Sequence, residues 1–137
     1  MNSAQLLILK KGDLVVDSIQ KFAARENIKG ALIQGLGAIK NFELGYYHLH
    51  TKTYERKWFK DDDYELLSLN GNIAIKDGAP FVHVHVAVGE VDFSVRGGHL
   101  FEAEVAVTVE LGLTRLDRVP ERHYDDCIGL YLIDKQI

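Results

Sequence analysis

The chain has 137 residues, a length typical of one domain, and we expect residues 1–137 to fold as a single domain with its own hydrophobic core. The apolar fraction of 47%, the charged fraction of 26% and the net charge of −4 are typical of a soluble globular protein and argue against a nucleic-acid-binding surface, which needs clustered Lys and Arg. The single cysteine, Cys127, excludes an intrachain disulfide and a thiolate metal cluster.

The N-terminus lacks the basic flank and apolar core of a signal peptide, and no apolar run approaches the roughly 20 residues of a membrane span. We therefore expect a cytoplasmic protein that makes no use of a membrane.

The first third of the chain predicts a strand, a helix and a second strand. Residues 5–9 form a short apolar run typical of a strand. Asp13 is a favourable N-cap, and apolar residues recur at helical spacing up to Asn27, so a helix is predicted there with Gly30 placed to end it. Residues 31–36 are apolar and predict a central strand.

From residue 44 onward the pattern is almost entirely that of strands. They are predicted over residues 44–59, 65–75, 81–88, 102–111 and 128–133. The segment Asn70-Gly71-Asn72 predicts a bulge or bend within its strand. The whole pattern indicates an α/β (α+β) fold, in which a mainly antiparallel sheet of about six or seven strands carries one main helix on a face. Because one helix covers only one face, we expect the other face to meet another subunit.

Three histidines form a candidate metal site. His83 and His85 are two residues apart in a predicted strand, so both side chains point to one face while the neighbouring valines point into the core. The hairpin of residues 89–98 would bring His99 back beside them, and Gly97 and Gly98 would let the backbone pass close to the site. Three neutral imidazoles suit a divalent metal, zinc first, and leave one position open for water or a small-molecule ligand. Imidazole also suits Cu, Fe and Ni. The alternative is a set of ordinary histidines on a solvated strand face.

A second His-x-His pair, His48 and His50, lies in a polar segment rich in Tyr and Lys. It has no third histidine behind a glycine turn. We interpret these two residues as surface or substrate-pocket residues, with the true metal site as the other possibility.

Four segments resemble the plant and prokaryote conserved (PPC) domain family. They are residues 35–39 (GLGAI), 65–73 (ELLSLNGNI), 80–86 (PFVHVHV) and 97–100 (GGHL), in the right order and spacing across the chain. The resemblance implies an α/β fold with an antiparallel sheet, a homotrimer and, in stand-alone prokaryotic members, a metal site at the positions of His83, His85 and His99. Plant members carry an AT-hook that holds DNA in the minor groove, and this sequence has no Arg-Gly-Arg-Pro-like segment. DNA binding is therefore implied by family association alone. Residues 89–93 also depart from the glycine-containing turn of the family.

Three further motifs could carry a function, but each also has a simpler structural interpretation. The Gly35-x-Gly37 pair is better explained by a strand-end turn than by a dinucleotide-binding loop, since no third glycine and no helix follow. Cys127 has His123 nearby, as a Cys–His nucleophile would, but a semi-buried structural cysteine is the simpler interpretation. Three acids of one strand could supply a general base near a metal-bound water or could simply form a solvated face: Glu102, Glu104 and Glu110.

Three functions are compatible with these patterns. The first is a trimeric zinc-binding module of regulatory or scaffolding type. The second is a small metal-dependent hydrolase or lyase, which the open metal position and the neighbouring acids would permit. The third is a DNA-binding protein.

Overall fold

The structure, a computed structural model, describes residues 3–136, with the backbone alone for residues 135 and 136. It contains one helix and eight strands in this chain order: β1 (Ala4–Lys10), α1 (Val15–Arg25), β2 (Ala31–His48), β3 (Thr53–Phe59), β4 (Tyr64–Lys76), β5 (Ala79–Gly89), β6 (Val95–Arg115), β7 (Pro120–Asp125) and β8 (Leu130–Gln136). Among the described residues, no helix is both long and apolar enough to cross a bilayer.

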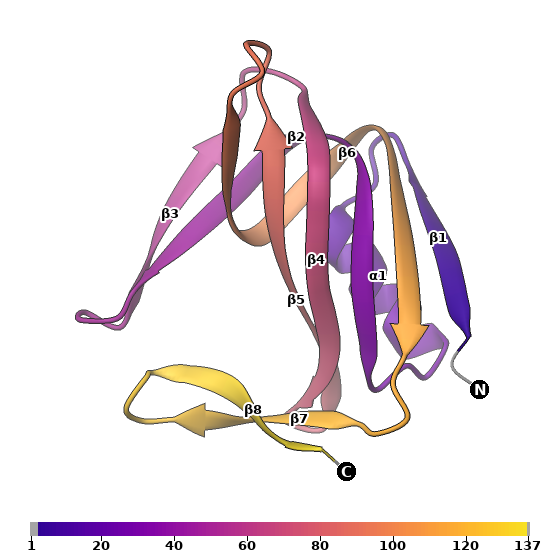
Figure 1. Cartoon of the computed structure of the whole chain (residues 1–137), viewed down its shortest axis with the longest axis vertical. Coiled ribbons are helices and arrows are strands. Elements are labelled where there is room, and N and C mark those ends of the chain that lie inside the picture. Colours follow the sequence, from indigo (N-terminus) through magenta and orange to yellow (C-terminus); the bar gives the residue numbers. More distant parts are fainter. Residues whose placement is uncertain (1–2, 137) are drawn as a thin grey trace.

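All eight strands belong to one sheet. Seven of them follow the order β3-β2-β6-β5-β4-β7-β8, and β1 pairs with β6 outside this path. The strand β2 also pairs with β4, so that β2, β6, β5 and β4 form a closed circuit of pairings, and Figure 1 shows the strongly curled sheet that results. Every pairing is antiparallel except the short one between β4 and β7, which makes the sheet mixed. The prediction of a mainly antiparallel sheet with one helix is thus confirmed.

Two details of the predicted strands were wrong. The sheet has eight strands instead of six or seven, because the C-terminal region forms a hairpin of two strands, β7 and β8, where one apolar run predicted one. The strand predicted over residues 31–36 runs on for 18 residues as β2, whose register shifts near Gly37 and after Lys40 let it bend from one neighbour to the next.

The bulge predicted at Asn70-Gly71-Asn72 is also absent from that position. The pairing of β4 with β5 is regular there, and the register shift lies between Leu66 and Ser68. A glycine is needed at position 71 for a different reason, because a Cβ atom there would overlap the carbonyl oxygen of His83 on β5. The glycine therefore allows close approach of the strand that carries two of the histidines.

The helix α1 packs its apolar face against β5 and β6, with Val15, Ile19 and Ala23 fully buried. Asp13 does not cap it, contrary to prediction, because its carboxylate accepts from the backbone N–H of Lys10. The cap comes from β6 instead.

Glu102 supplies that cap. Its two carboxylate oxygens accept hydrogen bonds from the backbone N–H groups of Val16 and Asp17 at 2.7 and 3.0 Å, where the positive end of the helix dipole favours an anion.

The helix ends at Arg25, before the predicted Gly30. Asn27 takes the left-handed conformation (φ 52°), and the N–H of Ile28 donates to the carbonyl of Ala23, as in a Schellman motif. Gly30 is instead a packing position, where a Cβ atom would lie 2.6 Å from Pro120 Cδ.

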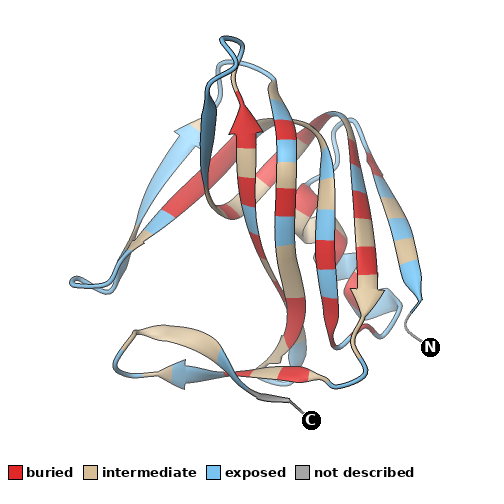
Figure 2. Cartoon of the chain, in the orientation of Figure 1, coloured by how far each residue is buried: buried red, intermediate tan, exposed pale blue. Residues whose placement is uncertain are grey.

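The two faces of the sheet differ in burial. Figure 2 shows buried and exposed residues alternating along β2, β4 and β6, with the helix lying behind the sheet in this view. The opposite, outer face exposes many apolar side chains around β1, β2, β4 and β6: Leu6, Ile8, Leu32, Leu36, Leu67 and Val107. The strands β1 and β2 both pair with β6, and the register places Ile8 and Leu36 opposite Glu110 on either side of it. Residues opposite one another in a sheet point to the same face, so these side chains share one surface.

Candidate metal centre

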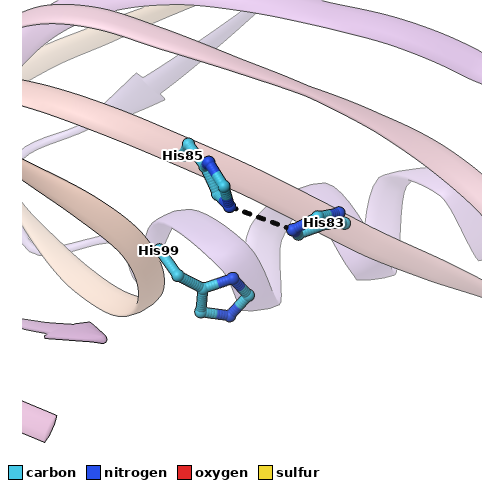
Figure 3. Close-up of side chains that lie close together, drawn as sticks. All are labelled: His83, His85 and His99. Carbon is cyan, nitrogen blue, oxygen red and sulfur yellow. Dashed lines mark hydrogen bonds between the residues drawn. The ribbon is translucent and has the colours of Figure 1, made fainter. Parts of the chain in front are cut away.

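The sheet brings the three predicted histidines together. His83 and His85 alternate on β5 with Val82, Val84 and Val86, which are all buried in the core. The register of β5 and β6 places His99 directly opposite His85. The predicted hairpin therefore returns His99 to the pair, and the three rings converge on one small space (Figure 3).

The ring nitrogens are close enough to share one ion. One nitrogen from each histidine lies within 4.8 Å of the other two, and the Nε2 atoms of His83 and His85 are 3.2 Å apart. Nitrogens bound tetrahedrally to zinc at about 2.0–2.1 Å lie roughly 3.3 Å from one another, so this pair already has the required separation. Nδ1 of His99 is buried and has no hydrogen-bond partner in the described part of the chain. An orphaned buried imidazole nitrogen is costly, and a metal ion would satisfy it.

The site holds the imidazoles of His83 and His99 in the neutral form. Burial, then the charge of Arg122 and the two other histidines, lowers the pKa of His83 to about 4. Burial, then His85 and Arg56, lowers the pKa of His99 to about 4. Both side chains are therefore neutral at pH 7, the protonation state in which an imidazole can bind a metal.

Aromatic rings pack around His99. The ring of Phe101 lies 4.7 Å from that of His99, and the ring of Tyr54 on β3 lies 5.1 Å from it. Arg56 stacks over Phe101 at 3.7 Å and pairs with the buried carboxylate of Glu43. Burial is also the main reason that the pKa of Tyr54 is raised.

Gly45 makes room for these rings. It lies opposite His99 on β2, and a Cβ atom there would lie 2.5 Å from Phe101. The pattern of the sequence singled out neither Gly45 nor the aromatic residues, because their roles depend on the pairing of β2 with β3 and β6. The two glycines that it did single out, Gly97 and Gly98, permit close approach as expected, since a Cβ atom at either would lie within 3.0 Å of a carbonyl oxygen across the sheet.

Arg122 on β7 borders the site from the other side. Its side chain is 7% exposed; Nη1 donates to the carbonyl of Tyr131, and Nη2 donates to Oδ1 of Asn72. The same Nη2 lies 3.3 Å from Nδ1 of His83. Burial lowers the pKa of Arg122 from its usual value. No sequence signal pointed to this residue, which enters the site only through the short parallel pairing of β7 with β4.

The three acids proposed as general bases are engaged elsewhere. Glu102 caps the helix, and Glu104 accepts from Asn41 and lies 3.8 Å from the ammonium group of Lys40. Glu110 lies on the outer face of the sheet, across from Leu36. None of the three forms a hydrogen bond or ion pair with the histidine cluster among the described residues.

The remaining candidates stay apart from the cluster. His48 and His50 are exposed at the turn between β2 and β3, with His48 3.8 Å from Glu55. Cys127 is exposed, not semi-buried as expected. His123 contacts the carboxylates of Glu121 and Asp134 rather than the Cys127 thiol. In the described part of the chain, these residues form neither a second metal cluster nor a Cys–His pair.

Comparison with known proteins shows the family to which this chain belongs. Residues 2–117 match the family described as the Plants and Prokaryotes Conserved (PCC) domain. The chain belongs to this family, the PPC domain proteins. A search of curated proteins found no relative.

Solved structures agree with this assignment. A metal-containing protein from Archaeoglobus fulgidus is 38% identical with a TM-score of 0.91, over 97% of this chain and 94% of that one. A PPC protein from Pyrococcus horikoshii is 37% identical with a TM-score of 0.90, over 98% and 95%. A protein from Bacteroides thetaiotaomicron, described as a candidate DNA-binding protein, is 26% identical with a TM-score of 0.89, over 98% and 99%.

Proposed function

We propose that this protein binds a divalent transition metal, zinc in the first instance, through His83, His85 and His99. The observation that carries the proposal is the convergence of three imidazoles, two of them with Nε2 atoms 3.2 Å apart and the third with a buried, unpartnered Nδ1. The description of the Archaeoglobus relative as metal-containing supports it. A bound metal would act there as a Lewis acid with one open coordination position.

We favour a regulatory or scaffolding role over hydrolysis or lyase chemistry. A metal-dependent hydrolase needs a base that can take a proton from the attacking water. Of the three acids assigned to that task, Glu102 caps the helix, Glu104 pairs with Lys40, and Glu110 lies on the outer face of the sheet. The charged side chains that do approach the cluster are Arg56 and Arg122, which are donors only.

We also propose that the chain assembles as a homotrimer through the outer face of its sheet. Leu6, Leu32, Leu36 and Val107 are each more than half exposed there. A surface of this kind is typical of a subunit interface. Light scattering coupled to size exclusion tests the assembly: three chains per particle are expected, and a monomer at micromolar concentration would contradict it.

Nucleic-acid binding has less support. The Bacteroides relative carries that description, but here the net charge is −4 and Arg56 is neutralised by Glu43. We expect no salt-dependent DNA binding at micromolar protein.

The metal centre is tested by titrating zinc into the purified, metal-stripped protein and measuring bound metal per chain. We expect one equivalent in the wild type, loss of binding in His99→Ala, and unchanged binding in the matched control His48→Ala. Less than about a tenth of an equivalent in the wild type, even with zinc in large excess over the protein, would contradict the proposal.

A further inference from the structure

Arg122 is a buried cation that has no carboxylate partner among the described side chains of residues 3–134. Its side chain is 7% exposed, and no described residue accepts a hydrogen bond from its buried Nε. Glu43, another buried charged residue, is paired with Arg56 at 2.6 Å, whereas no ion pair of Arg122 occurs within residues 3–136. Since an uncompensated buried charge is destabilising, its position beside the histidines calls for a reason other than stability.

The guanidinium is directed at one particular atom of the cluster. Nη2 of Arg122 lies 3.3 Å from Nδ1 of His83, while Nε2 of His83 faces Nε2 of His85. An arginine N–H can only donate, so Nδ1 is the acceptor in this contact. The neutral imidazole of His83 then carries its hydrogen on Nε2, the nitrogen that faces the other histidines.

Metal binding requires the opposite arrangement. If Nε2 of His83 coordinates a metal with its lone pair, its hydrogen must lie on Nδ1, and a metal-ligating histidine normally donates that N–H to a carboxylate, a carbonyl or water. Here Nδ1 meets a donor that also bears a positive charge.

The guanidinium is not free to move aside. Its bonds to Oδ1 of Asn72 on β4 and to the carbonyl of Tyr131 on β8 hold it in place, and the backbone of Arg122 is paired with Lys76. A metal at the cluster must therefore either tolerate the charge or break these contacts.

We propose that Arg122 is a positioning residue that opposes metal binding: it holds His83 in the tautomer that cannot coordinate through Nε2, and so makes the site one of low affinity from which metal exchanges. The inference rests on the proposed metal centre. It places control of that centre in the β7–β8 hairpin, which lies beyond the residues 2–117 that match the family.

The test compares Arg122→Gln with the wild type by zinc competition against a chromophoric chelator. Glutamine removes the charge and offers an oxygen that can accept from Nδ1 of His83. The matched control is Arg115→Gln. Arg115 is the last residue of β6, far along the strand from His99, and its side chain donates to the backbone carbonyl of Glu26. We expect zinc to bind Arg122→Gln about 10–100-fold more tightly than the wild type, the range over which partners of metal-ligating histidines act. Arg115→Gln should match the wild type.

Two outcomes separate the inference from the metal centre on which it rests. Zinc binding by the wild type with equal or weaker binding by Arg122→Gln would overturn the role of Arg122 and leave the metal centre standing. Absence of zinc from both proteins would overturn both proposals.

A second measurement needs no variant. Long-range ¹H–¹⁵N NMR of the metal-free wild type reports which ring nitrogen of His83 carries the hydrogen. We expect Nε2–H, and an Nδ1–H tautomer would refute the inference.

Discussion

Replacing Gly45 by alanine would press a methyl group into the aromatic wall of the candidate metal centre. The added Cβ would lie 2.5 Å from Cε2 of Phe101 and 3.0 Å from Cδ1 of Tyr54, whereas ordinary contacts begin at 3.4 Å. Phe101 must therefore retreat by about 0.9 Å. It has little room to do so, because Arg56 stacks over its ring at 3.7 Å and the ring of His99 lies 4.7 Å away.

Overpacking of this kind costs about 1–3 kcal/mol of unfolding free energy. A glycine-to-alanine change also restricts the unfolded chain, which stabilises by about 0.4–1 kcal/mol where the backbone tolerates it. Gly112→Ala on β6 isolates the clash, because its added Cβ would make only ordinary contacts, 3.8 Å from the carbonyl of Gln34. We expect Gly45→Ala to be less stable than Gly112→Ala by about 1–3 kcal/mol.

Urea unfolding monitored by circular dichroism, with a chelator present, measures this difference. Zinc competition on the same samples should show weaker binding in Gly45→Ala alone, because the displaced Phe101 ring contacts the imidazole of His99. Equal stability and equal zinc affinity in the two variants would refute the reasoning.

Three further outcomes are expected. Zinc at 100 times its dissociation constant should stabilise the wild type by about 2.7 kcal/mol in thermal unfolding and leave His85→Ala unchanged; equal shifts in both would place the metal elsewhere. Glu102→Gln should lower the unfolding free energy by about 1 kcal/mol in urea, because the N–H groups that begin α1 lose their anionic partner, and an unchanged midpoint would contradict this role. The pKa of His123 is raised, mainly by its hydrogen bond to Asp134, so the pairing contributes stability below the ordinary histidine pKa and loses it as the pH rises through the raised value; NMR titration should show that pKa falling in Asp134→Asn.

The predictions that succeeded depended on local periodicity. The alternation of His83 and His85 with buried valines follows from the two-residue repeat of a strand, and the same repeat predicted most of the sheet. The cap of α1 could not be predicted in this way. Asp13 is the better candidate by local chemistry, but the carboxylate of Glu102 arrives from a strand more than 80 residues away.

The His-x-His spacing and the predicted hairpin of residues 89–98 by themselves indicated that three imidazoles would converge, because side-chain direction in a strand and reversal at a hairpin are properties of short segments. Only the tertiary structure decided what surrounds them. Gly45 and Arg122 reach the cluster through pairings of β2 with β6 and of β7 with β4, and such long-range contacts leave no periodic trace in the sequence. The pairing of β7 with β4 also brought a guanidinium to Nδ1 of His83, which is why the histidine cluster could be predicted from the chain and the surroundings of His83 could not.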